Sequence, residues 1–256
     1  MDIPHRDPGF VDPKSNVGKF PRPAQFADVL VVGAGKAGIA AALKAARAGQ
    51  SVLLVDEHPV APGMAGLDVP YLFGGRATGA IANQARMIEQ VAANIDGLDE
   101  VYDAGVEVLL GVSVWGAWVN GPNLQALPCP IAGLATEERS WLCGFGSIVV
   151  ASGARDLVLS FKGSDQPGVV GAQALHALLT RYDAFAGRNI VLLGSGRLAL
   201  ETALLALDRG LAVPALIEVR DRPQGPEDLL AALRARSVEI LCGHVPLMAE
   251  TTTDGV

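Results

Sequence analysis

Three glycines near the start of the chain are spaced as Gly-x-Gly-x-x-Gly, within VVGAGKAG at residues 31–38. Gly33, Gly35 and Gly38 follow a short apolar run and precede an Ala-rich helical pattern. At a strand-to-helix turn the first glycine permits the tight turn, the second lets the backbone approach a pyrophosphate, and the third allows close helix packing. The free N–H groups of the helix N-terminus attract phosphate. This spacing predicts a binding site for a dinucleotide.

An acidic residue follows where such a site needs one. Asp56 ends the next apolar run, about 20 residues after the glycines, and its carboxylate can accept hydrogen bonds from a ribose diol. Glu57 comes next and can share or replace that role. The alternative is a plain βαβ unit with a glycine turn. The complete order of strand, loop, helix, strand and acid favours the nucleotide site.

A second copy of the pattern lies in LLGSGRLA at residues 192–199. Gly194 and Gly196 are present, and Ala199 takes the third position, which the fingerprint tolerates. Glu218 ends the following apolar run, and an acid there favours a free 2′-hydroxyl, hence NAD over NADP. Three arginines could instead accept a 2′-phosphate: Arg197, Arg220 and Arg222. The alternative is a Rossmann-like half that is retained only for packing and binds no nucleotide.

The elements that must position these loops can be read from the apolar periodicity. In the first unit we expect strands at 28–32 and 51–55 around a helix at 36–48. Between the units we expect helices at 77–93 and 171–180, and strands within 106–119 and at 124–127, 139–142 and 147–150. In the second unit we expect strands at 189–193, 213–219 and 238–241, and helices at 196–208 and 226–235.

The predicted fold is therefore α/β, with two Rossmann-like dinucleotide-binding units and a small antiparallel β layer. Prolines crowd the first part of the chain and disfavour regular helix there. The predicted organisation is an extended leader at 1–27, a first domain at 28–160 and a second nucleotide-binding domain at 161–256.

Composition narrows the function classes. The 256 residues are 50% hydrophobic with a net charge of -7, and no basic stripe supports a nucleic-acid partner. No apolar run reaches the length of a membrane span, and no signal peptide is evident, so we expect a cytoplasmic protein. Cys129, Cys143 and Cys242 form no CxxC and no zinc spacing, so we expect no metal site and a reducing compartment.

Longer stretches resemble a known superfamily. DVLVVGAGKAGIAAALKAARAGQSVLLVDE, residues 28–57, resembles the FAD-binding start of the two-dinucleotide-binding-domain flavoproteins. IVVASGA, residues 148–154, is similar to the second FAD signature, with Ser152 in place of the usual threonine. Residues 164–179 and 187–210 resemble the α-type subunits of heteromeric amine and amino-acid dehydrogenases: sarcosine oxidase α, opine oxidase, hydroxyproline dehydrogenase and hydrogen cyanide synthase. The resemblance covers about residues 26–250.

The resemblance implies FAD at the first loop and NAD(P) or another adenine nucleotide at the second. Near the FAD it places these residues: Gly33, Ala34, Gly35, Ala37 and Gly38 at the pyrophosphate, Asp56 and Glu57 at the ribose, Val114 near the adenine, and Ala151, Ser152 and Gly153 where the chain returns to the cofactor. At the second nucleotide it places Gly194, Ser195, Gly196, Arg197 and Glu218.

Two departures from the superfamily matter. Its FAD domain is completed by a C-terminal segment carrying Gly-Asp, and Val256 precedes any such segment, so either another polypeptide completes the domain or the chain is a truncated relative. The disulfide reductases of the superfamily use a cysteine pair, whereas Cys129 and Cys143 flank ordinary apolar sequence and are expected to be core thiols. No catalytic side chain can be named, and His58 and His176 have no partner visible in the sequence.

The sequence therefore favours a FAD-binding subunit of a heteromeric oxidoreductase, with other subunits as partners and an amine or amino acid as substrate. In this hypothesis the chain relays electrons or holds a nucleotide. A stand-alone NAD(P)H-dependent flavin reductase is the first alternative. A non-catalytic nucleotide-binding scaffold subunit is the second.

Overall fold

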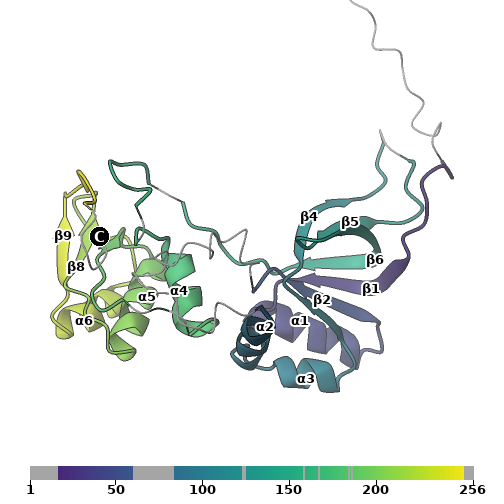
Figure 1. Ribbon diagram of the computed structural model, residues 1–256, viewed down its shortest axis with the longest axis horizontal. Coiled ribbons are helices and arrows are strands. Elements are labelled where there is room, and N and C mark those ends of the chain that lie inside the picture. The colour runs from purple at the N-terminus through teal and green to yellow at the C-terminus, as the bar shows by residue number, and fades with distance from the viewer. Residues whose placement is uncertain are drawn as a thin grey trace, which may run out of the picture. The chain divides into compact units, whose positions relative to one another are not determined.

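The computed structural model describes residues 17–59 and 84–250, apart from 123, 124, 158, 167, 184 and 186. The chain divides into two compact units (Figure 1). The first comprises residues 1–58 and 96–152, and the second comprises residues 59–95 and 153–256. Each contains one of the two glycine loops.

The first unit is built on a parallel sheet that starts with the predicted βαβ unit. β1 (Gln25–Val32) leads through the glycine loop into α1 (Lys36–Arg47), and β2 (Val52–Asp56) follows. β1 pairs in parallel with β2, and β2 pairs in parallel with β3 (Glu107–Leu110). All five residues of β2 are buried, as expected for a central strand of a sheet covered on both faces.

One long strand joins the parallel and antiparallel parts of this sheet. β6 (Ser140–Val150) pairs with β5 (Ile131–Ala135) through its first half and with β1 over most of its length, and β5 pairs with β4 (Ser113–Trp118). The order is β3-β2-β1-β6-β5-β4, so the two strands expected at 139–142 and 147–150 are one strand. β3 and β4 follow each other in sequence but stand at opposite ends of this order.

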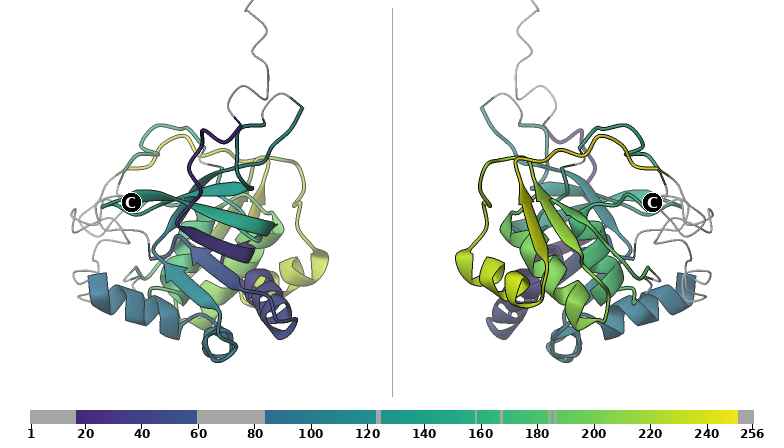
Figure 2. Two further views of the ribbon diagram at one scale, coloured as in Figure 1. Left: turned by 90° about the vertical axis from the view of Figure 1, so that its right-hand side faces the viewer. Right: turned by 90° about the vertical axis from the view of Figure 1, so that its left-hand side faces the viewer.

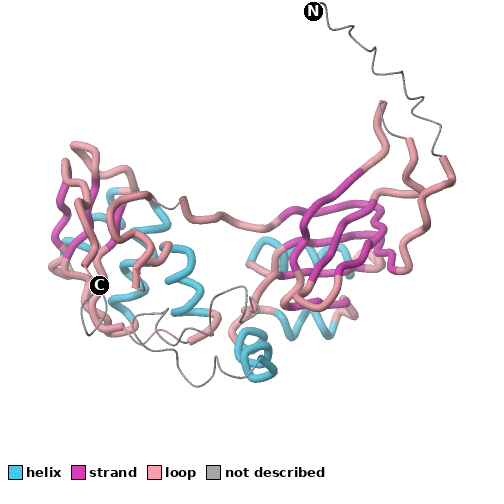
Figure 3. Tube along the Cα trace, turned by 45° about the horizontal axis from the view of Figure 1, so that its top comes forward, coloured by secondary structure: helices cyan, strands magenta, loops and turns pink. Residues whose placement is uncertain are grey.

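The antiparallel part covers one face of the parallel part, and the helices cover the other. Ala132 and Leu134 of β5 share a buried cluster with Leu53 and Val55 of β2, although two strands separate β2 from β5 in the sheet. The expected small β layer is thus a continuation of the same sheet, curled over its own face. α1 and α3 (Leu98–Asp103) lie on the opposite face (Figure 1), and Figure 3 distinguishes these helices from the strands by colour.

Some elements differ from the sequence prediction. α3 and β5 were not expected: α3 has only six residues, and β5 consists of small and apolar residues without alternation. The described residues of the expected strand at 124–127 are not a strand, and the Asn120 side chain instead bonds the backbone of Leu127. α2 (Gln84–Ala93) occupies the second part of the helix expected at 77–93, and residues 77–83 lie outside the described residues.

The second unit repeats the βαβ arrangement. β7 (Leu192–Leu193), α5 (Arg197–Asp208), β8 (Ala215–Glu218), α6 (Glu227–Ala235) and β9 (Glu239–Cys242) follow one another. The three strands are parallel, in the order β7-β8-β9. The right-hand view of Figure 2 shows β8 and β9 running side by side. All five elements were predicted, with boundaries shifted by a few residues.

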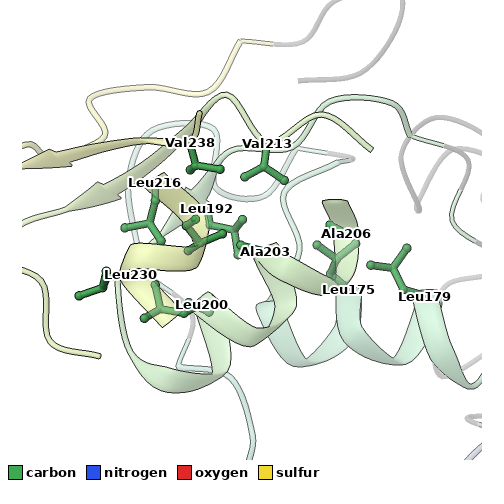
Figure 4. Close-up of a cluster of buried hydrophobic side chains, with 12 residues drawn as sticks. Leu175, Leu179, Leu192, Leu200, Ala203, Ala206, Val213, Leu216, Leu230 and Val238 are labelled. Atoms are coloured by element: carbon green, nitrogen blue, oxygen red, sulfur yellow. The ribbon is translucent and has the colours of Figure 1, made fainter. Parts of the chain in front are cut away.

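Leucines and alanines form the core of the second unit. α4 (Ala172–Thr180) contributes Leu175 and Leu179, α5 contributes Leu200 and Ala203, and Leu216 comes from β8. Figure 4 shows these side chains gathered in one cluster. Complete burial of each leucine contributes about 2 kcal/mol. This cluster fixes the helix that follows the second glycine loop.

Within the described residues, no helix is long and apolar enough to cross a membrane. The same residues contain no group of three or more His, Cys, Asp or Glu side chains that could hold a metal ion.

Candidate nucleotide-binding sites

The first glycine of the first loop is required by the protein itself. Gly33 has φ +106, a left-handed conformation that other residues rarely adopt. Its N–H donates to the Val55 carbonyl oxygen at 2.7 Å, which ties the loop to β2. A Cβ added at this position would lie 2.4 Å from the Ala151 carbonyl oxygen. The loop and the end of β6 therefore pack backbone against backbone.

Gly38 and Gly35 are required for different reasons. A Cβ at Gly38 would lie 1.7 Å from the Gly33 carbonyl oxygen, so the third glycine lets α1 begin directly against the loop. Gly35, the N-cap of α1, is extended, and a Cβ there would meet no described protein atom within 4 Å. Nor does a described side chain cap this helix N-terminus. The protein packing alone gives no reason for a glycine at position 35, whereas a diphosphate approaching the helix does.

The acidic residue after β2 is bound to the loop. Asp56 is 6% exposed. Its Oδ2 accepts the Ala34 N–H at 2.6 Å, and its Oδ1 accepts the His58 N–H at 2.8 Å. Two hydrogen bonds thus hold the carboxylate beside the loop, which is where a ribose would have to lie to reach both the acid and the diphosphate site.

The second loop reproduces this scheme bond by bond. The Gly194 N–H donates to the Ile217 carbonyl oxygen at 2.7 Å, and Gly194 has φ +92. Glu218 is 4% exposed, and its Oε2 accepts the Ser195 N–H at 3.1 Å while its Oε1 accepts the Arg220 N–H at 3.0 Å. The internal duplication predicted from the glycine pattern therefore extends to the individual hydrogen bonds.

The duplication includes two glycines that the sequence analysis missed. Gly111 after β3 donates its N–H to the His58 carbonyl oxygen at 3.0 Å, and Gly243 after β9 donates to the Arg220 carbonyl oxygen at 2.9 Å. Both have positive φ, +72 and +69. In each unit the third strand thus ends in a left-handed glycine bonded to the residue two places after the acid. A glycine directly after each third apolar run was the signal that could have found them.

The two loops differ in one buried hydroxyl. Ser195 occupies the place of Ala34, and its Oγ donates to Glu218 Oε2 and accepts the Gln224 N–H at 2.9 Å. Burial opposes ionisation of Glu218, but the hydrogen bonds from Ser195 and Arg220 outweigh it, so the pKa of this carboxyl lies below its ordinary value. Glu218 is thus an ionised group held by three donors.

The structure places the remaining predicted residues as follows. Ala151 follows β6 and donates its N–H to the Val32 carbonyl oxygen at 2.8 Å, next to the loop, and exposed Ser152 and Gly153 come after it. Half-buried Val114 lies on β4, two residues after Val112, whose N–H donates to the Asp56 carbonyl oxygen at 3.0 Å.

Three other predicted residues lie beside the loops and take no part in the hydrogen bonds described above. Ala37 is exposed in the first turn of α1, and Glu57 is half-buried after Asp56. Arg197 is exposed and forms an ion pair with Glu201 at 3.1 Å.

Burial shifts the pKa of one thiol and one imidazole among the described residues. Burial raises the pKa of the Cys143 thiol to about 11. Cys143 pairs with Ala132 across the sheet, whereas the Cys129 sulfur lies against Gly144, so the two thiols are on opposite faces. Burial lowers the pKa of His176.

The fold is of the Rossmann-like dinucleotide-binding type, with one βαβ arrangement and one glycine loop in each unit. Residues 27–254 match the family model described as pyridine nucleotide-disulphide oxidoreductase, and the chain belongs to that family.

Comparison with known proteins gives two oxidase subunits as relatives. The chain is 31% identical to the alpha subunit of sarcosine oxidase from Rhizobium meliloti (strain 1021), over 84% of this chain and 21% of that protein. It is 28% identical to an opine oxidase subunit from Agrobacterium tumefaciens (strain Ach5), over 79% of this chain and 38% of that protein. The chain thus spans only a fifth to two fifths of the length of these curated relatives.

Solved structures share the fold. Thioredoxin reductase from Lactococcus lactis superposes with a TM-score of 0.55 at 19% identity, covering 90% of this chain and 68% of that one. L-proline dehydrogenase from P. horikoshii superposes with a TM-score of 0.50 at 22% identity, covering 79% of this chain and 37% of that one. The mixed α/β architecture predicted from the sequence is confirmed.

The family supports FAD as the cofactor, with NAD(P) binding also common in it. The residues of the first unit fit a dinucleotide: Gly35 leaves open space at an uncapped helix N-terminus, and Asp56 is held beside it. The second unit offers the same open glycine at Gly196 and the same held acid at Glu218.

Proposed function

We propose that this chain is the FAD-binding part of a heteromeric oxidoreductase that oxidises an amine or an amino acid. The relatives named as sarcosine oxidase and opine oxidase subunits support the substrate class and the heteromeric arrangement. The chain spans a minor part of those proteins, so the amine substrate and the partner subunits are proposed for it from these relatives. Its three free cysteines fit a reducing compartment, the cytoplasm.

The open glycine in the first loop carries this proposal. Gly33 and Gly38 are explained by contacts within the protein, but Gly35 is not. The N–H groups at the start of α1 and the carboxylate of Asp56 supply the two recognition elements of an adenine dinucleotide, one for the diphosphate and one for the ribose.

In the bound state, FAD would supply the redox chemistry with which this chain relays electrons in the oxidation of the amine. The chain's own residues would bind and orient the cofactor. Gly33, Gly35 and the first turn of α1 would hold the diphosphate, Asp56 would hold the adenosine ribose, and Ala151 would close the loop from the side of β6.

The first unit also has a sheet edge that supports a partner. β5 pairs with β6 only over Ser140–Gly144, and beyond that point the described pairing of β6 is with β1 alone. Val150 at this edge is 69% exposed. Beside it, α1 and the sheet border an open depression of about 320 Å³ whose lining includes Val29, Ala45 and Val149. Among the described residues no strand pairs with this edge of β6, and an unpaired edge beside exposed Val150 favours a further polypeptide at this place.

The test is a pair of matched glycine variants. Gly35 and Gly196 are both extended N-cap residues at which an added Cβ meets no described protein atom within 4 Å, so we expect either fold to tolerate valine. We expect Gly35→Val to lose FAD and Gly196→Val to retain it, as measured by flavin absorbance and by mass spectrometry of the released cofactor. Full flavin content in Gly35→Val would remove the first loop as the FAD site.

A further inference from the structure

Exposed aromatic side chains of the first unit gather on β1 and β4. Phe26 on β1 is 55% exposed, and Trp115 and Trp118 on β4 are 57% and 36% exposed. Val119, the residue after β4, is 60% exposed. We call these four residues the tryptophan patch. Large apolar side chains that lie together at a protein surface mark an interaction surface.

The strand register places the patch on one face of the sheet. Trp118 pairs with Ile131, Ile131 with Gly144, and Gly144 with Phe26. These positions therefore form one row across β4, β5, β6 and β1, and paired residues point to the same face. Ala132, the next residue on β5, belongs to the buried cluster beneath the curled sheet. The patch consequently lies on the outer face.

Both tryptophan rings of the patch lie against glycines of this face. A Cβ at Gly116 would lie 2.5 Å from the Trp118 ring, and a Cβ at Gly133 would collide with the Trp115 ring. The register shifts between Val114 and Gly116, and such an irregularity lets Trp115 point to the same face as Trp118. The two rings meet edge to face with their centroids 4.9 Å apart. Each ring therefore packs on the sheet with one side and exposes the other.

The patch continues into an open sheet edge. β4 is the last strand in the order of the sheet, and one of its edges pairs with β5 (Figure 1). No described strand pairs with its other edge. β4 contains no charged residue, although charged side chains commonly protect exposed strand edges from pairing with other chains. This surface therefore favours a segment that covers it.

The chain has a segment of suitable composition close to the patch. Phe26 is the second residue of β1, and residues 1–16, which lie outside the described residues, precede it in the sequence. They include Pro4, Pro8 and Pro13. Proline favours the polyproline II conformation. Surfaces of exposed aromatic rings bind such segments, because a polyproline II segment loses little conformational entropy on binding.

The described residues allow this segment to reach the patch. Residues 17–19 form a turn in which Gly18 has φ +78, and a chain that turns here can run back beside residues 20–26. Val17 lies at most about 32 Å from Phe26, and the row from Phe26 to Trp118 crosses three strand spacings, about 15 Å. Residues 1–16 extend about 50 Å in polyproline II conformation, which is enough to cross the whole patch.

We propose that residues 1–16 dock across the tryptophan patch of their own chain and cover the open edge of β4. Because the segment is tethered beside the patch, its effective concentration there is about millimolar, so weak contacts suffice. The docked segment prevents the edge of β4 from pairing with another chain.

The test compares the full chain with a variant that lacks residues 2–16, at equal flavin content. We expect acrylamide to quench the tryptophan fluorescence of the shortened chain about twofold more strongly, because two of the three tryptophans lose their cover. A synthetic peptide of residues 1–16 should restore the weaker quenching. A peptide with Pro4, Pro8 and Pro13 replaced by alanine should restore it far less, because it is not preorganised.

Trypsin cleavage after Lys14 gives a readout that does not depend on fluorescence. Trp115→Ala in the full chain should accelerate this cleavage several-fold, because proteolysis follows the undocked population. Tyr102→Ala is the matched control and should leave the rate unchanged. Tyr102 is also exposed, but it lies on α3, on the other face of the sheet (Figure 1). If Trp115→Ala fails to fold, the shortened chain still decides the question, because it retains every strand of the sheet.

Two results would overturn this proposal. The first is equal quenching in the full and the shortened chains, together with equal cleavage after Lys14 in the Trp115→Ala and unaltered proteins. The second is quenching of the full chain that weakens as its concentration rises, with a dimer in sedimentation velocity. In that case a second copy of the chain, and not residues 1–16, covers the patch.

Discussion

Replacing Ser195 with alanine removes one buried hydroxyl that joins three parts of the second unit. Its Oγ donates to Glu218 and accepts from the Gln224 N–H, and the residue is 1% exposed. A hydrogen bond to a charged group contributes about 1.5–3 kcal/mol and a neutral one about 0.5–1.5 kcal/mol. Glu218 keeps two other donors, and Gln224 can turn to water, so we expect a loss of about 2–3 kcal/mol in the free energy of unfolding of this unit. The fold accommodates alanine here, because Ala34 occupies the equivalent place in the first unit.

The positions of the tryptophans allow the two units to be followed separately. All three tryptophans, Trp115, Trp118 and Trp141, lie in the first unit, so their fluorescence reports that unit in a urea titration. Far-UV circular dichroism reports both units. Ser195→Ala should lower the stability seen by circular dichroism and leave the fluorescence transition in place. Hydrogen exchange of the amides in α5 should accelerate correspondingly.

A second serine provides the matched control. Ser51 Oγ likewise donates to a carboxylate, Asp28, and accepts a backbone N–H, that of Asp28, but both residues are exposed to solvent. Water replaces such bonds readily. The shift of the fluorescence transition in Ser51→Ala should therefore be far smaller than the shift of the circular dichroism transition in Ser195→Ala. An unchanged circular dichroism midpoint and unchanged α5 exchange in Ser195→Ala would refute the view that this hydroxyl holds the loop.

Two further predictions concern buried groups. Thr202 is completely buried in α5, and its hydroxyl has no hydrogen-bond partner in the described structure, so Thr202→Val should leave the unfolding free energy unchanged or raise it by about 1 kcal/mol in a urea titration; a clear loss would show that the hydroxyl is bonded. Because burial raises the pKa of Cys143 to about 11, its alkylation by iodoacetamide in native protein should be slow at pH 8 and accelerate only toward pH 11, and the stability that this protonated thiol contributes should decline as pH rises through the same window. Fast alkylation of Cys143 at pH 8 would contradict its burial.

The local pattern predicted those parts of the fold in which each strand is followed directly by its helix. The residues of α1, α5 and α6 alternate in a helical period, and each helix begins directly after a glycine or a proline, so their existence and most of their boundaries follow from sequence. The path of β6 does not, because a strand that pairs with β5 at one end and β1 along the rest depends on partners distant in sequence.

The features of the two candidate sites likewise separate into those that the sequence predicts and those that only the tertiary structure shows. The sequence by itself determined the glycines, the acids and their order, since each acts through a local requirement of the turn or the helix N-terminus. Only the tertiary structure decided that Gly35 has open space where Gly33 and Gly38 have none, and that Glu218 is bound by Ser195 and by the Arg220 N–H. The physical reason is that space and hydrogen-bond partnership depend on what packs against a residue, and those neighbours come from strands and loops that the linear pattern does not bring together.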